Sequence, residues 1–247
     1  MISRYRLVLI VAAMFCLLTG LIAGRLAPQA AAAEDGSPSL APGQAPAASY
    51  DPQQEYLFEI IKSRRTVRNF QPTPVPKEHI LKILDMARSA PTSGNQQPWK
   101  FLVVQDRARL DRLRDEAAAW FLEAYEKRTQ SDPEGLAKLR KRLPETMAKV
   151  LSAPVYVAVL TDSRSAYPPD NRHDGPLAAA LLMIAARSLG YGTGFYTSYF
   201  PEEPMRRFFG IPERYNLVCF TPIGVPVEWP PAPAKKPLED FVVFEKF

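Results

Sequence analysis

Apolar and polar positions along residues 53–247 form blocks that predict helices separated by short strands. Blocks with apolar residues three or four apart indicate helices, and short β-branched or apolar runs indicate strands. The predicted helices span residues 53–64, 77–89, about 106–127, 134–151, 177–189 and 201–209, and the predicted strands span 101–105, 155–161 and 217–224. This order predicts an α+β sandwich of three layers, in which helices flank a mixed β-sheet on both sides.

Two of these blocks are apolar almost throughout. The run Val155–Thr161 lacks polar alternation, which predicts a strand buried on both faces. The helix Leu177–Leu189 is apolar nearly all round, so we expect it at the centre of the molecule and of any dimer. Asp174 is expected to cap this helix, with Pro176 in its first turn.

The first 33 residues have the pattern of a targeting segment. Arg4 and Arg6 precede the apolar run Leu7–Gly24, and Ala31 and Ala33 provide a small-x-small cleavage site. A signal peptide or an uncleaved membrane anchor would each place the rest of the chain outside the cytoplasm. Residues 34–52, rich in Ala, Pro, Ser and Gly, are predicted to be a disordered linker, which leaves residues 53–247 as the folded domain.

The composition of the chain argues against several classes of function. The net charge is +5 without an aromatic-interleaved basic stripe, so a nucleic-acid partner is not expected. Two histidines without Cys/His spacing do not provide a usual zinc site, and no metal ligand is predicted. Cys219 lies in an apolar run and is expected to be a buried small hydrophobe.

Candidate chemistry begins directly after the first helix, in a cluster of arginines. Arg64, Arg65 and Arg68 fall within five residues, together with the hydroxyl of Thr66. Guanidinium groups are rigid, always-charged donors that suit phosphate oxygens. A last helical turn running through Arg64 and Arg68 would place them on one face. The alternatives are a site for a small dianion and a solvated basic surface.

A polar loop about twenty residues later complements this cluster. The segment Ala90–Trp99 reads APTSGNQQPW and offers hydroxyls, amides and backbone N–H groups between two prolines. Such a loop can surround the hydrogen-bonding edge of a planar heterocycle. A phosphate clamp and a ring cradle together are what a phosphorylated flavin needs.

Four motifs in this order resemble the FMN-dependent nitroreductase superfamily. They are RRTVRNF at 64–70, APTSGNQQPW at 90–99, the glycine-rich SLGYGTGF at 188–195 and the basic PAKKPL at 233–238. The resemblance covers residues from about 55 to 247. The glycines at 190, 192 and 194 would let the backbone approach the ring, or would merely end the preceding helix in a Schellman-type cap.

The resemblance implies a cofactor, FMN, and a set of residues that bind it. Arg64, Arg65, Thr66 and Arg68 would clamp its phosphate, ribityl and pyrimidine ends, and Lys235 or Lys236 would add a further cation to the phosphate. The family usually has Arg at this last position. The ring would be surrounded by Pro91, Thr92, Ser93 and Asn95 from across a dimer interface, and by Phe195, Tyr196 and Thr197. Members of the family typically form intertwined homodimers with exchanged C-terminal arms, and the proline-rich arm 225–237 fits that habit. No side chain is expected to act as a catalytic acid.

The activity implied is transfer of hydride from NADH or NADPH, through the flavin, to nitro compounds, quinones or similar acceptors. One alternative is reductive dehalogenation, as in the nitroreductase-like iodotyrosine deiodinases, which clamp substrate with a Glu, a Tyr and a Lys between the first two strands. This chain has Glu116, Glu123, Tyr125 and Lys127 there, but Trp120 stands four residues after Glu116. Another alternative is a flavin-binding protein without turnover.

Overall fold

In the part of the chain that the structure describes, the sheet has four strands, and helices cover both of its faces. The chain divides into two units, Met1–Ser49 and Tyr50–Phe247, and the computed structural model describes residues 51–128 and 132–247. The strands are β1 (Trp99–Val104), β2 (Val155–Asp162), β3 (Gly192–Thr193) and β4 (Tyr215–Gly224), in the order β1-β2-β4-β3. All three strand pairs are antiparallel, and the parallel pairing expected of a mixed sheet is limited to an isolated bridge between Thr66 and Thr193.

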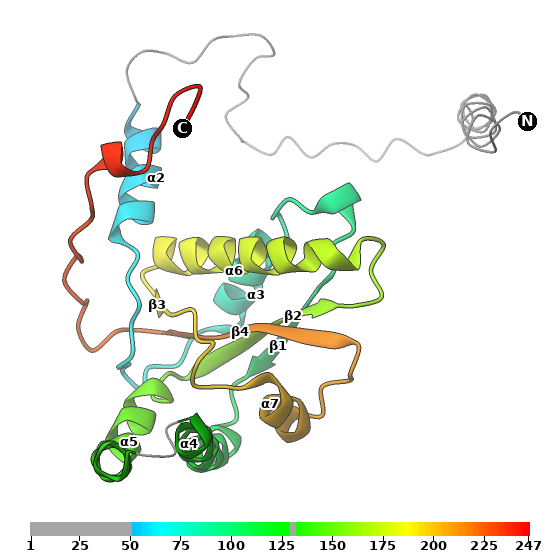
Figure 1. Cartoon of the computed structure of the whole chain (residues 1–247). Coiled ribbons are helices and arrows are strands. Elements are labelled where there is room, and N and C mark those ends of the chain that lie inside the picture. Colours follow the sequence, from blue (N-terminus) through cyan, green and yellow to red (C-terminus); the bar gives the residue numbers. More distant parts are fainter. Residues whose placement is uncertain (1–50, 129–131) are drawn as a thin grey trace, which may run out of the picture. The chain divides into compact units, whose positions relative to one another are not determined.

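The described residues form six α-helices, five of which make up the two outer layers. They are α2 (Pro52–Ser63), α3 (Lys77–Ala87), α4 (Arg107–Arg128), α5 (Pro133–Val150), α6 (Asn171–Ser188) and α7 (Glu202–Phe209). Short 3₁₀ turns are η1 (Ser93–Asn95), η2 (Pro168–Asp170) and η3 (Leu238–Asp240). Helices α3 and α6 lie on one face of the sheet, and α4, α5 and α7 lie on the other (Figure 1). The α+β three-layer sandwich predicted from the sequence is therefore present.

The packing of strand β2 on both faces explains why its sequence shows no polar alternation. Tyr156, Ala158 and Leu160 pack into the hydrophobic cluster under α4, α5 and α7, whereas Val155, Val157 and Val159 pack into the cluster under α3 and α6. Successive side chains of a strand point to opposite faces, so a central strand between two helical layers needs an apolar residue at every position.

Cys219 of β4 is buried in the same way, within the cluster under α3 and α6. It is fully buried, as predicted, and burial raises the pKa of its thiol to about 12. The thiol is therefore a packing group rather than a nucleophile at neutral pH.

Helix α6 begins six residues earlier than its apolar pattern predicts. It starts at Asn171, so the prediction that Asp174 is the N-cap was wrong. The Asp174 carboxylate instead accepts hydrogen bonds from another segment, at 2.7 Å from the Gln96 side chain and 3.4 Å from the Ser93 backbone N–H. The first turn of α6 shows no apolar pattern because its polar residues Asn171 and Asp174 face this second segment rather than the core.

At the end of α6, Gly190 has one of the two roles predicted for the glycines, that of a helix cap. Gly190 adopts φ +85°, and the backbone N–H of Tyr191 donates to the Ala186 carbonyl at 2.9 Å while that of Gly190 donates to Arg187 at 3.0 Å. This pair of bonds is a Schellman cap. Gly192, in contrast, lies where a Cβ would come within 2.7 Å of Val67 and 2.8 Å of Pro226, so close approach of protein segments requires it.

The C-terminal residues leave the sheet after β4 as an extended arm. Two backbone hydrogen bonds attach its start, from Gln71 to the Val225 carbonyl at 2.8 Å and from Val227 to the Asn69 carbonyl at 3.1 Å. Beyond Val227 the arm makes no further backbone hydrogen bond to the other described residues. Residues 238–247 form one 3₁₀ turn and no strand.

The predicted leader (1–33) and linker (34–52) lie almost wholly outside the described residues. Among residues 51–128 and 132–247, no helix has the length and apolar character needed to span a bilayer.

Candidate functional site

The arginine segment is extended, not helical. Helix α2 ends at Ser63, and Arg64 has φ −60° and ψ 132°. The prediction of a last helical turn through Arg64 and Arg68 was wrong because the backbone N–H of Val67 donates to the Thr193 carbonyl at 2.8 Å, which holds the segment against β3. Arg64, Arg65 and Thr66 are partly buried, and Arg68 is exposed.

A cleft lies between this segment and the C-terminal arm. Its volume is about 490 Å³, and it is lined by Ile61, Lys62, Arg64, Arg65, Thr66, Pro230, Pro231, Pro233 and Lys235. The structure thus brings Lys235 to the arginine cluster across more than 160 residues of sequence. Arg68 and Lys236 are not among the lining residues.

Arg65 is the most constrained side chain of the cleft. Its Nη1 donates to the Lys62 carbonyl at 2.6 Å and to the Arg64 carbonyl at 2.9 Å. Its Nε is buried and has no hydrogen-bond partner among the described residues. A buried charged donor without an acceptor is costly, and in a cleft it indicates an acceptor supplied by a ligand. The geometry therefore fits an oxyanion such as a phosphate.

An interaction that the sequence did not suggest connects the two walls of the cleft. Arg187, on the last turn of α6, donates from Nε to the Ser63 hydroxyl at 3.0 Å. Its guanidinium also lies 4.2 Å from the centroid of the Trp229 ring on the arm. Arg187 thus contacts the end of α2 and the arm at once. Only the position of Trp229 beside a proline run could have suggested this from sequence.

The amide-rich loop is fixed at the other end of α6. Gln96 donates from Nε2 to Asp174 and accepts the backbone N–H of Tyr167 at 2.7 Å. Three loop residues have left-handed backbone, with φ +56° at Gly94, +55° at Asn95 and +47° at Gln97. Non-glycine residues adopt this conformation rarely, and such positions concentrate at functional sites. Pro91 and Asn95 are exposed, and Thr92 and Ser93 are partly buried.

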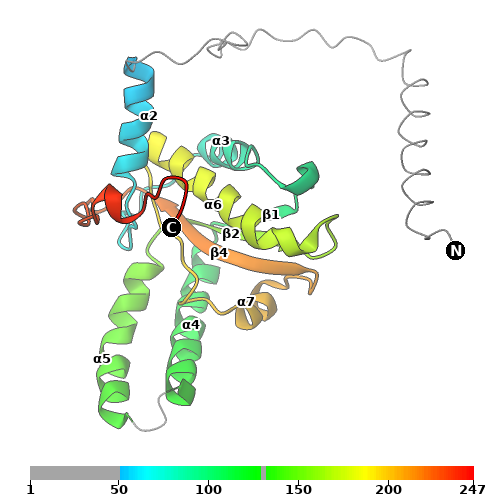
Figure 2. The same cartoon turned by 45° about the horizontal axis from the view of Figure 1, so that its top comes forward.

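One protomer does not bring the loop to the arginine cleft. The loop contacts the first turn of α6, and the cleft lies at its last turn, where Arg187 meets Ser63. Helix α2 and the segment before β1 accordingly lie at opposite ends of α6 (Figures 1 and 2). An α-helix of 18 residues is about 27 Å long. The two halves of the predicted site are therefore separated by roughly that distance within the chain.

The three residues predicted to line the ring differ in exposure. Phe195 and Thr197 are exposed, but Tyr196 is only 3% exposed. The Tyr196 hydroxyl donates to the Val67 carbonyl at 2.6 Å, and burial raises the pKa of this tyrosine while the positive charge of Arg68 opposes the shift. The Tyr196 side chain thus supports the arginine segment from within the core, and only its backbone could face a ring.

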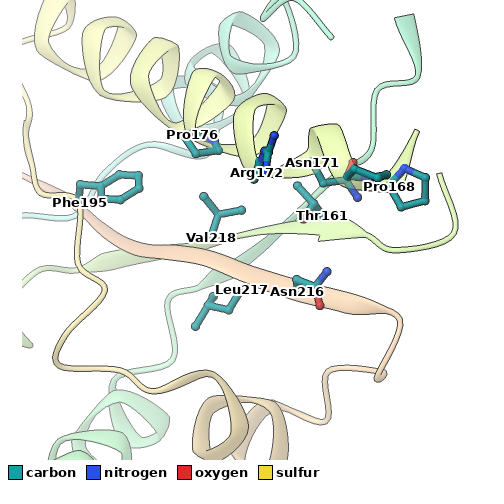
Figure 3. Close-up of a pocket in the computed structure, with 10 residues that line it drawn as sticks. Thr161, Pro168, Asn171, Arg172, Pro176, Phe195, Asn216, Leu217 and Val218 are labelled. Atoms are coloured by element: carbon teal, nitrogen blue, oxygen red, sulfur yellow. The ribbon is translucent and has the colours of Figure 1, made fainter. Parts of the chain in front are cut away.

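Phe195 lines a second cavity that the sequence did not reveal. This cavity, of about 460 Å³, lies between the start of α6 and strand β4. Figure 3 shows Phe195 and Pro176 toward one end, with Asn171 and Pro168 toward the other, above Val218 of β4. It extends from the region expected to line the ring toward the polar first turn of α6.

Comparison with known proteins decides the family. Residues 61–225 match the sequence model of the nitroreductase family. This chain belongs to the nitroreductase family. A protein of Methanothermobacter thermautotrophicus with the provisional name NADH dehydrogenase/NAD(P)H nitroreductase is 34% identical over 178 residues, covering 70% of this chain and 79% of that protein.

Two further matches are iodotyrosine deiodinases. Iodotyrosine deiodinase of Thermotoga neapolitana is 28% identical over 174 residues, covering 69% of this chain and 88% of the relative. A crystal structure of oxidized iodotyrosine deiodinase bound to FMN and 3-iodo-L-tyrosine superposes with a TM-score of 0.64 at 25% identity, over 77% of this chain and 100% of that one. The resemblance inferred from the four motifs is confirmed.

Proposed function

We propose that this protein is an FMN-dependent oxidoreductase that passes hydride from NADH or NADPH to nitro compounds, quinones or similar conjugated acceptors. The observation that carries the proposal is the cleft in which Arg64, Arg65, Thr66 and Lys235 meet and the buried Nε of Arg65 has no acceptor among the described residues. FMN, when bound, supplies the hydride chemistry, and the protein binds and orients it.

Each wall of the cleft has a distinct task in this proposal. The guanidinium groups of Arg64 and Arg65 donate to phosphate oxygens, and the Thr66 hydroxyl adds a neutral donor. Lys235 approaches from the arm as a point charge, which gives less directional binding than the Arg usual in the family. Arg68 lies outside the lining of the cleft. In this proposal it binds the ribityl or pyrimidine end of FMN, or it adds positive charge near the phosphate.

The ring end of the site requires a second copy of the chain. Pro91, Thr92, Ser93 and Asn95 lie one helix length from the cleft of their own protomer, so they can meet a flavin only in another protomer's cleft. The side of α6 away from the sheet is suited to such a contact, since Leu177 is 43% exposed and Leu181 and Ile184 are only half-buried. An exposed apolar helix face of this kind favours association. We therefore propose a homodimer with two composite sites.

The decisive assay follows the visible absorbance of the flavin. Protein loaded with FMN is mixed with NADH or NADPH without oxygen, and a nitroaromatic is then added. Bleaching by a donor followed by recovery with the acceptor supports the proposal. A yellow protein that neither donor bleaches would defeat the enzyme proposal and leave a flavin-binding protein without turnover.

A second candidate activity is reductive dehalogenation, favoured by the similarity to the deiodinase structure. Three of the four residues considered for a substrate clamp contact other groups. Lys127 pairs with Glu123 at 2.6 Å, and the Tyr125 hydroxyl donates to Asp132 at 3.1 Å. Release of iodide from 3-iodo-L-tyrosine by the chemically reduced protein would establish this activity.

The compartment of the reaction is a separate proposal. Residues 1–33 would export the domain or anchor it with the domain outside the cytoplasm, where nicotinamide donors are scarce and another electron donor could take their place. A reporter fused after residue 52 tests export, and a reporter that is active only in the cytoplasm would contradict it.

A further inference from the structure

A basic hollow lies between α4 and α7, on the face of the sheet opposite α6. Its volume is about 340 Å³, and it is lined by Arg109, Arg112, Glu116, Trp120, Pro204, Arg207 and Phe208. Helices α4 and α7 run next to each other there (Figures 1 and 2). The arginine cleft is formed by α2 and the arm, so the two share no lining residue.

The three arginines of the hollow are unpaired. Among the described residues, the guanidinium groups of Arg109, Arg112 and Arg207 make no ion pair within 4.0 Å and no hydrogen bond. Glu116 is the one acid of the lining and pairs with none of them, which leaves a formal charge of +2. The charge of Arg207 contributes to lowering the pKa of Glu123, but the main cause is the hydrogen bond from Lys127.

Neighbouring arginines on the same helices show the contrast. Arg107 and Arg114 both pair with Asp111, at 3.1 and 3.0 Å. On α7, Arg206 pairs with Glu202 at 2.9 Å. The acids next to the hollow thus pair with arginines outside it, and the three exposed arginines that line it have no acid partner among the described residues.

An aromatic wall accompanies these charges. The rings of Trp120 and Phe208 meet edge to face, with centroids 6.3 Å apart and an interplanar angle of 78°. Both side chains are half-buried, so the wall is held in place while part of it faces the hollow. Aromatic faces stack on planar rings, and guanidinium groups bind phosphate and carboxylate in a bidentate manner.

We propose that this hollow is a binding site for a planar aromatic molecule that carries an oxyanion group. The arginines bind the oxyanion, and Trp120 and Phe208 contact the ring. Two sources share this chemistry: the adenosine-phosphate end of a nucleotide, and an aromatic carboxylic acid. The site is separate from the FMN cleft and does not depend on the proposed activity.

The test measures binding to the full chain by calorimetry, with adenosine 2′,5′-bisphosphate and with benzoate as probes. The variant Arg109→Ala/Arg112→Ala removes two unpaired charges from α4. The matched control, Arg107→Ala/Arg114→Ala, removes two charges from the same helix, but these are paired and outside the hollow. Thermal unfolding of both variants verifies that they fold.

We expect the hollow variant to bind the effective probe roughly 10–100-fold more weakly, as expected for one or two lost charge-assisted hydrogen bonds. The control should change less than about 2-fold. Binding of the bisphosphate alone assigns a nucleotide, of benzoate alone an aromatic acid, and of both the shared chemistry. Failure of the wild-type protein to bind either probe overturns the proposal, and so does an equal loss in both variants, which would indicate general electrostatic attraction.

A second variant tests the aromatic wall. Trp120→Leu should weaken the aromatic probe by about 5-fold or more, since stacking of a base on an aromatic side chain contributes about 1–3 kcal/mol. Binding of inorganic phosphate, which has no ring, should be unchanged. An equal loss for both ligands would contradict stacking on Trp120.

Discussion

Replacing Arg187 tests whether the C-terminal arm is part of the cofactor site. Its guanidinium donates to Ser63 at 3.0 Å and lies 4.2 Å from the Trp229 ring centroid. A cation–π contact at a partly exposed site contributes about 0.5–1 kcal/mol. The hydrogen bond to Ser63 joins α6 to α2, so only the contact with Trp229 holds the arm. Arg187→Ala should therefore weaken docking of the arm by about 0.5–1 kcal/mol.

The effect on FMN follows from the position of Lys235. Lysine reaches the cleft only when the arm is docked, so the apparent dissociation constant rises as the docked fraction falls. Because docking loses about 0.5–1 kcal/mol, FMN affinity should fall by at most roughly 2- to 5-fold. Flavin fluorescence titration of the flavin-free protein measures this. Riboflavin, which lacks the phosphate, should bind with nearly unchanged affinity.

Matched variants separate this mechanism from general effects. Trp229→Leu should reproduce the loss, and the double variant should add little, because both changes break the same contact. Arg88→Ala removes an equal charge from a pair with Asp85 on the surface and should leave FMN binding unchanged. Unchanged FMN affinity in Arg187→Ala, or an equal loss for riboflavin, would refute the role assigned to the arm.

Three further changes test other parts of the structure. Asp174→Asn should speed amide hydrogen exchange in residues 92–97, because the charged acceptor of Gln96 is lost, and protection equal to wild type would contradict this anchor. Tyr196→Phe should lower the free energy of unfolding in urea by about 0.5–1.5 kcal/mol through loss of the bond to Val67; a stability equal to wild type would count against it. Removal of residues 238–247 should shift sedimentation from dimer toward monomer, and an unchanged profile would argue against an exchanged arm.

The sequence predicted the layers of the fold because burial leaves a direct pattern. The uninterrupted apolar run of β2 reflects packing against two clusters, and Cys219 in a similar run is fully buried. The start of α6 was missed for the opposite reason. Its first turn carries Asn171 and Asp174, which are polar yet buried because they bond to the loop that contains Gln96.

The sequence predicted residues that line the cleft, but it did not predict the conformation of their backbone. Arg64, Arg65 and Thr66 do line one cleft with Lys235, but they do so as an extended segment, since pairing of Val67 with Thr193 competes with the helix. Long-range contacts of this kind leave no local pattern. The contact of Arg187 with Trp229 was invisible for the same reason, because 42 residues separate two side chains whose pairing depends on the path of the arm.

The central claim is that the cleft of Arg64, Arg65, Thr66 and Lys235 binds the phosphate of FMN. The most direct measurement titrates flavin-free wild-type protein and Arg65→Ala with FMN and with riboflavin. Wild type should bind FMN roughly 10–100-fold more tightly than riboflavin, as one or two charge-assisted hydrogen bonds predict, and Arg65→Ala should lose most of this preference. Equal affinities of the wild-type protein for FMN and riboflavin would contradict the claim.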